Sequence, residues 1–224
     1  MEKNEKKSDT ENIEKDDSKK LFFKSKGFFL ALFLLFGLII YFSFFHVSFE
    51  NEYQIDDNTY QIDDNTYDYN GYIFTRNQLD RATVWQLSTE RINFDFRNPP
   101  WDVDHIPKPE GLIYSLNGIN HIFLTTQPDY PSDIVLGMVD VAKLFNPKLE
   151  LYNITAQSGL MQDGYEQPKI TCEEQYEGEL IIEFLKGDDT YITHSNNCIQ
   201  VYGETKEDVV KASNLLAYTY LGII

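Results

Sequence analysis

An apolar run without a single charge covers residues 27–45 near the start of the chain. A helix of this length, rising 1.5 Å per residue, nearly crosses the hydrocarbon core of a bilayer. Four lysines lie between positions 19 and 26, whereas the first charges after the run are acidic. Because basic residues stay on the cytoplasmic side, we expect the N-terminus inside the cell and residues 46–224 outside it. The sequence therefore predicts a single-pass protein of the cell membrane.

The apolar run differs from a cleavable secretory signal. Such a signal has a shorter apolar core and ends in small residues that a peptidase can cut, whereas bulky aromatic residues end this run. We therefore interpret residues 27–45 as an uncleaved signal anchor. The Lys26-Gly27 pair also resembles the leader of pilin-like proteins, so cleavage after Gly27 remains an open alternative.

The outer part of the chain is strongly acidic. Of the 36 acidic residues, 29 follow the apolar run, against 11 of the 19 Lys and Arg, which gives this part a net charge of about −18. Nucleic-acid phosphates and anionic lipid surfaces both require basic residues, so the charge argues against either partner for the outer part. It fits a soluble, self-repelling surface, a saline habitat or divalent-cation binding.

Two cysteines, Cys172 and Cys198, both lie in the outer part. An even number of cysteines in an oxidising compartment favours a disulfide, and their spacing is unlike the C-x-x-C of a redox pair. The bridge would close a loop of about 25 residues and stabilise the fold by about 3 kcal/mol if its effect is entropic. We expect a structural disulfide, with two free thiols as the alternative.

A tandem heptad, YQIDDNT twice in succession, occupies residues 53–66. Two copies are too few for a repeat fold, and Asp, Asn and Thr are poor helix formers. We interpret residues 46–70 as an acidic linker to an extracytoplasmic domain at 71–224. Residues 1–26 are polar without an apolar stripe and are expected to form a disordered cytoplasmic tail.

The carboxylates of the repeat offer a second interpretation. Carboxylate oxygens are the preferred ligands of hard cations such as Ca²⁺. The EF-hand pattern, with its central Gly and terminal Glu, is missing from this segment. The alternative to a spacer is therefore a Ca²⁺ site built from Asp56, Asp57, Asp63 and Asp64.

The folded domain is expected to be α+β. Apolar residues recur at helical spacing over 132–145, and a capping-box pattern opens a second helix over 205–221. An Asn-Gly pair at 117–118 is typical of a tight hairpin. We expect a mixed, mostly antiparallel sheet with the two helices packed on one face. Its strands are predicted at 72–76, 84–88, 92–97, 112–116, 119–125, 149–155, 169–172, 179–185, 191–194 and 198–202.

Short motifs within residues 72–223 carry a family resemblance. They are the INFDFRNPP segment, the helix after a turn at 129–133, and the ending NCIxVxG with a later Asp and a terminal Leu-Gly. In these features the chain resembles a group of uncharacterised archaeal single-pass membrane proteins with a C-terminal extracytoplasmic α+β domain. The resemblance implies a membrane-anchored outer domain with a pair of cysteines. It implies no activity and transfers no functional residue.

The chain contains no recognisable catalytic motif: a G-x-S-x-G elbow, an H-E-x-x-H helix and a P-loop are all missing. His105 follows two Asp residues but lacks the paired His or Cys of a zinc site, so we interpret it as part of a polar loop. Asn153 begins an N-x-T sequon and is a candidate glycosylation site in an exported chain. No catalytic residue, metal or cofactor is predicted.

These observations favour a non-catalytic role. We expect the outer domain to serve in cell-surface interaction or as a subunit of an envelope assembly, through a protein partner or self-assembly. The alternatives are a pilin-like filament subunit and an envelope enzyme such as a hydrolase. A large exposed apolar patch would favour interaction, and a deep pocket with converging carboxylates would favour the enzyme.

Overall fold

Within the part of the chain that the structure describes, strands precede the first α-helix. This computed structural model describes residues 53–56, 58–80, 82–89, 92–130, 132–174 and 177–224. All of these belong to one unit of the chain, which begins at Glu52. The predicted anchor at 27–45 and the predicted tail at 1–26 lie outside the described residues. Within the described residues, no helix is both long enough and apolar enough to cross a bilayer.

The first sheet is an antiparallel meander whose strands pair in chain order. Every second side chain points to one face, and on that face the register sets Phe74 beside Leu87 and Leu87 beside Phe94, all buried. The strands are β1 (Tyr53–Asp56), β2 (Thr59–Gln61), β3 (Thr66–Tyr69), β4 (Tyr72–Gln78), β5 (Thr83–Ser88) and β6 (Asn93–Phe96).

The heptad repeat builds the beginning of this sheet. The first copy supplies β1, a turn and the first residue of β2, and the second copy completes β2, turns and starts β3. One heptad is therefore one strand plus one turn. The structure differs here from the expected linker at 46–70, since β3 pairs with β4 inside the domain. Tyr, Ile and Thr favour strands, and the Asp-Asn pairs supply the turns.

The second sheet is mixed, in the order β10-β11-β9-β7-β8. Its neighbours pair in parallel, except that β10 is antiparallel to β11. Across both sheets, antiparallel pairings are the majority in the described part of the chain. The strands are β7 (His121–Thr126), β8 (Thr155–Leu160), β9 (Glu179–Lys186), β10 (Tyr191–Ser195) and β11 (Cys198–Gly203).

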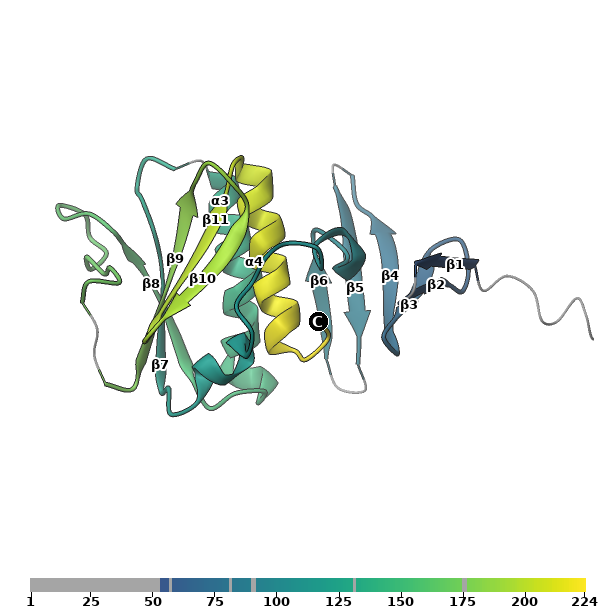
Figure 1. Ribbon diagram of the computed structural model, residues 1–224, viewed down its shortest axis with the longest axis horizontal. Helices are drawn as coiled ribbons and strands as arrows, with labels where there is room; N and C mark the ends of the chain where they lie inside the picture. Colours follow the sequence, from purple (N-terminus) through teal and green to yellow (C-terminus); the bar gives the residue numbers. More distant parts are fainter. Residues whose placement is uncertain (1–52, 57, 81, 90–91, 131, 175–176) are drawn as a thin grey trace, which may run out of the picture. The chain divides into compact units, whose positions relative to one another are not determined.

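Two α-helices, α3 (Ser132–Ala142) and α4 (Lys206–Tyr220), lie between the two sheets (Figure 1). On one side α4 packs against β9 and β11. On the other side the ring of Tyr218 lies 5.8 Å from that of Phe74 and 4.5 Å from that of Phe96, both in the first sheet. The α+β class and the two helices are confirmed, but α4 packs between two sheets instead of on one face of a single sheet. Short 3₁₀ helices complete the fold: η1 (Pro100–Asp102), η2 (Leu112–Leu116), η3 (Lys143–Phe145) and η4 (Pro147–Leu149).

Three of the expected strands do not form. Residues 112–116 are η2, so the predicted Asn-Gly hairpin is absent, and residues 149–155 are mostly irregular. Residues 169–172 make only an isolated bridge to β8. Conversely, residues 156–160 belong to no predicted strand but form most of β8. It is an edge strand whose first four residues are exposed, so it lacks the apolar alternation that identifies a half-buried strand.

Candidate functional site

Helix α3 exposes large aliphatic side chains on one side. Val135, Leu136 and Val139 are 45, 39 and 42% exposed, although Ile134 and Met138 beside them are buried. Residues three and four apart lie on the same face of a helix, so the three exposed side chains form one patch, which we call the α3 patch. Val135 is one of the apolar residues that recur at helical spacing in this segment, yet its side chain is exposed. Clustered apolar side chains at a surface are typical of interaction sites.

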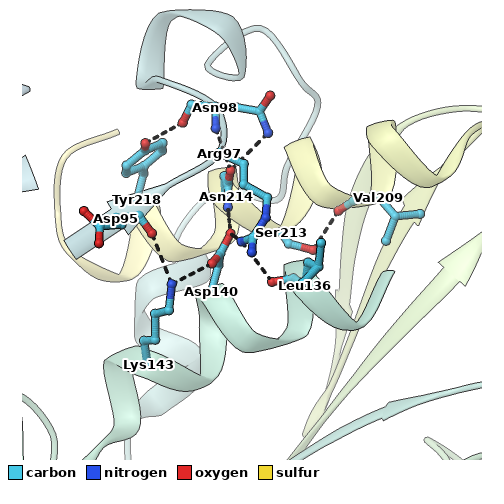
Figure 2. A network of polar contacts seen from close by, with 10 residues as sticks. All are labelled: Asp95, Arg97, Asn98, Leu136, Asp140, Lys143, Val209, Ser213, Asn214 and Tyr218. Carbon is cyan, nitrogen blue, oxygen red and sulfur yellow. Dashed lines mark hydrogen bonds and ion pairs between the residues drawn. The ribbon is translucent and has the colours of Figure 1, made fainter. Parts of the chain in front are cut away.

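The opposite side of α3 is locked against α4. A Cβ atom at Gly137 would lie 2.6 Å from Ser213 Oγ and 3.3 Å from the Cα atom of Val210, so only glycine permits this approach. Ser213 Oγ donates a hydrogen bond of 2.6 Å to the carbonyl oxygen of Val209 and is thereby held in place (Figure 2). The α3 patch is therefore carried by a helix whose backbone is tightly packed against its neighbour.

Asp140 anchors the same helix through a buried ion-pair network (Figure 2). Its carboxylate is fully buried and accepts from Arg97 Nη1 at 2.5 Å, Lys143 Nζ at 3.0 Å and Asn214 Nδ2 at 3.0 Å. The two cationic side chains remain 32 and 39% exposed. All three donors are protein groups in fixed positions, so Asp140 is a structural acid and is not placed to act on a substrate.

The network continues into the segment after β6. The main-chain and side-chain nitrogens of Asn98 donate to Asn214 Oδ1 at 3.0 and 3.1 Å, and Tyr218 donates from its hydroxyl to the carbonyl oxygen of Asn98 at 2.6 Å. Burial, together with the charges of Asp140 and Asp102, raises the pKa of Tyr218 well above its usual value. The INFDFRNPP segment therefore joins the first sheet to both helices, and its buried polar groups are paired.

A small cavity of about 280 Å³ lies where β9 and β11 end and α4 begins. The carboxyl ends of parallel strands are where many α/β sheets bind ligands. Here, however, Lys206 is paired with Asp133 and Glu207, and the capping box of Thr205 and Asp208 occupies the end of α4. The described lining residues include no Ser, Cys or His that could act as a nucleophile or its base. They are Tyr130, Ile134, Lys186, Glu204, Thr205, Lys206, Glu207 and Val209.

Residues 168–172, which we call the strap, cross the face of the second sheet that points away from the helices. The main-chain nitrogen of Ile170 donates to Leu160 of β8 at 2.8 Å, and its carbonyl oxygen accepts from Thr125 Oγ1 of β7 at 3.0 Å. A Cβ atom at Gly159 would lie 3.0 Å from Ile170 Cδ1, so glycine allows this close approach. The strap is thus fixed across two strands before it reaches β9.

The strap ends in a disulfide between Cys172 and Cys198, which confirms the predicted bridge. The two Cα atoms lie 5.4 Å apart, and Cys198 is the first residue of β11. Cys172 also donates its main-chain N–H to Glu183 Oε1 of β9 at 2.7 Å. The bridge therefore joins the strap to the sheet at a point where a buried carboxylate already holds it.

Glu183 belongs to a row of polar residues that the strand register sets side by side. Thr125, Glu183, Gln200 and Thr193 occupy paired positions on four neighbouring strands. Gln200 donates from Nε2 to Glu183 Oε2 at 2.8 Å, so both carboxylate oxygens accept hydrogen bonds. Sequence reasoning assigned no role to Glu183. The available signal was a single Glu within residues 180–185, which are otherwise apolar.

Cys172, Glu183 and Cys198 form the one group of three potential metal ligands found among the described residues. Their ligand atoms all lie within 4.8 Å of one another. The metal ligand of a cysteine is its thiolate, and both sulfur atoms are bonded to each other here. In this state the group does not offer a metal site.

The four aspartates of the heptad repeat are placed only in part. Asp63 Oδ1 accepts from the main-chain nitrogen of Asn65 at 2.8 Å, and this bond, with one from the Thr66 side chain, lowers the pKa of Asp63. Asp64 is exposed in the same turn. The side chain of Asp56 and the whole of Asp57 lie outside the described residues, so the Ca²⁺ site stays a prediction.

Asn153 is exposed in the irregular segment between η4 and β8. It does not lie at the end of a strand, as the sequence had indicated, because β8 begins only at Thr155. An exposed loop is the setting that glycosylation requires, and the modification stays a prediction.

Thr155 Oγ1 lies 2.6 Å from Nδ1 of His121, so that imidazole has a structural neighbour.

Comparison with known proteins adds no relative: no protein-family model, curated protein or solved structure matches the chain. Function is therefore inferred from the features of the domain itself. Of these, the α3 patch and the strap with its disulfide are the two that the packing of the domain itself does not fully account for.

Proposed function

We propose that this chain is a membrane-anchored protein whose extracytoplasmic α+β domain binds a protein partner in the cell envelope and has no catalytic role. The observation that carries the proposal is the α3 patch. Three large aliphatic side chains on successive turns of one helix remain open to solvent, although the same helix is tightly packed on its other side. Covering such a patch with a partner removes apolar surface from water and favours association.

The compartment is supported by the disulfide between Cys172 and Cys198, because such bonds persist mainly in oxidising environments. The apolar run at 27–45, the acidic outer part and the resemblance to archaeal single-pass membrane proteins agree with the same topology. Acidic charge also argues against nucleic acid as the partner of the outer domain. Together these features support a tethered domain that meets its partner outside the cytoplasm.

The proposal is tested by photo-crosslinking in the membrane of the native cell. A photoreactive amino acid at Val139 should give a discrete adduct, and the additional change Leu136→Asp should abolish it, because a charge in the patch prevents apolar contact. Leu79 provides a matched control, since it is an exposed leucine, 55% accessible, in the connection between β4 and β5. A photoreactive residue there should give no such adduct.

Equal adducts from positions 79 and 139, or an adduct that survives Leu136→Asp, would refute the proposed surface. An adduct of two copies of this chain would identify the partner as the chain itself. The intact mass of the protein extracted from the membrane decides the pilin-like alternative separately. Loss of residues 1–27 would replace the anchored domain by a processed filament subunit.

A further inference from the structure

Glu183 is a buried acid that has no cationic partner among the described residues. Asp140 and Glu183 are the two acidic residues with buried side chains in the described part of the chain. Asp140 is paired with Arg97 and Lys143, whereas no described Lys, Arg or His forms an ion pair with Glu183. A buried carboxylate that is not neutralised exerts a strong field on its neighbours, because the surrounding dielectric is low.

The nearest redox-active group to this carboxylate is the disulfide. A Glu183 oxygen and the sulfur atoms of Cys172 and Cys198 lie within 4.8 Å of one another. The carboxylate cannot easily turn away, since Oε1 accepts from the Cys172 main chain and Oε2 from Gln200. The strand register also fixes Glu183 and Gln200 as direct neighbours. The negative charge is therefore held beside the sulfur atoms by the sheet itself.

We propose that the Glu183 carboxylate protects the Cys172–Cys198 disulfide against reduction by thiols. In thiol exchange, an external thiolate attacks one sulfur, a new S–S bond forms, and the old bond breaks with its electron pair leaving on the second sulfur. Cys172 is half-buried and Cys198 is almost fully buried, so attack is easier at Cys172 and Cys198 becomes the leaving thiolate. A second thiol of the reagent then completes the reduction and forms the reagent's own disulfide.

Both charged species of this reaction meet the field of Glu183. The attacking thiolate approaches a negative carboxylate, and the leaving thiolate of Cys198 develops its charge in a buried position beside that carboxylate. Exchange slows when the leaving thiol is a poorer leaving group. Two negative charges at this separation repel appreciably even with partial screening. We expect the carboxylate to slow reduction about tenfold, which corresponds to about 1.4 kcal/mol in the barrier.

The test measures the rate of reduction of the full-length chain by dithiothreitol, followed by alkylation and mass. Glu183→Gln keeps the size of the side chain and an oxygen for the Cys172 N–H, and it should be reduced about tenfold faster. Glu173→Gln makes the same change next to Cys172 at an exposed residue, and its rate should equal that of the wild type. An unchanged rate in Glu183→Gln, or equal acceleration in Glu173→Gln, would overturn the proposal.

A second measurement separates the charge effect from loosening of the fold. Glu183→Gln weakens two charge-assisted hydrogen bonds, but it also removes a buried charge that has no described cationic partner. The oxidised forms of both variants should therefore melt close to the wild-type temperature. The wild-type chain should also be reduced more slowly by an anionic than by a cationic monothiol of equal thiol pKa. This bias should persist at about 1 M salt, where exposed charges are screened but buried ones much less so. A bias that vanishes in salt would refute the role of Glu183, even if Glu183→Gln failed to fold.

Discussion

The buried network around Asp140 allows a direct comparison of two ways to break an ion pair. Asp140→Asn keeps the volume of the side chain but removes its charge. Its three donors would then face a neutral amide, and each bond to a charged group contributes about 1.5–3 kcal/mol against about 0.5–1.5 for a neutral one. Because Arg97 and Lys143 are about one-third exposed, water compensates part of their loss. We expect Asp140→Asn to lower the free energy of unfolding by about 2 kcal/mol.

Removing the cations should cost more than removing the acid. The double variant Arg97→Met, Lys143→Met leaves the Asp140 carboxylate fully buried, with Asn214 as its remaining side-chain donor among the described residues. Leaving an uncompensated buried charge costs about 3–5 kcal/mol. The order of the two losses follows from the unequal burial of the partners, since the acid cannot reach water and the cations can.

Urea unfolding of the full-length chain in mild detergent, followed by tryptophan fluorescence, measures both losses. A double variant Lys206→Met, Lys211→Met is the matched control, because it removes two cations from exposed pairs and should leave the midpoint nearly unchanged. If Asp140→Asn proved at least as destabilising as the double cation variant, burial of the acid would not be the deciding factor, and the reasoning would fail.

Further changes test other parts of the fold. Gly203→Ala would place a Cβ atom 2.2 Å from a main-chain nitrogen of α4 and should lower the free energy of unfolding by about 3 kcal/mol or more, measured in urea. Cys172→Ser should lower the free energy of unfolding by about 3 kcal/mol and thereby lower the melting temperature under oxidising conditions. An unchanged melting temperature would exclude a structural bridge. The hydrogen bond from Thr205 lowers the pKa of Asp208 in the folded protein. The stabilisation of the fold by this bond is therefore complete above the unfolded pKa of Asp208, about 3.9, and is lost as pH falls through the lower folded pKa. Thr205→Ala should therefore cost about 1 kcal/mol at pH 6 and less at pH 3, by thermal melting.

Much of the fold could be predicted because its signals are local. The capping box before α4, the apolar spacing of α3 and the largely apolar sequence of β9 each identify an element without help from the rest of the chain. The disulfide followed from counting cysteines in an exported domain. By contrast, the repeat at 53–66 was interpreted as a spacer, because its copies are short and polar. They form strands by pairing with one another and, through β3, with β4.

The candidate sites were harder to predict because they depend on contacts between distant residues. Asp140 interrupts the apolar face of α3, but only the fold brings Arg97 and Asn214 to it. Glu183 stands alone in an apolar strand, and only the strand register and the strap bring it to the disulfide. A single charge in an apolar element was the available signal in both cases, and its partner could not be read from spacing.

The second sheet could have been inferred from α4. Nearly all of its residues from Val209 onward are buried, and no charged side chain follows Lys211, so this part of the helix is uncharged and buried on all sides. A helix of that kind must be covered on both faces, and here the two sheets provide the cover. Helix α3 differs from α4, because its apolar residues Val135, Leu136 and Val139 remain uncovered by the described part of the chain. If apolar faces of helices imply a covering layer, the layer missing from α3 is supplied by the partner that we propose.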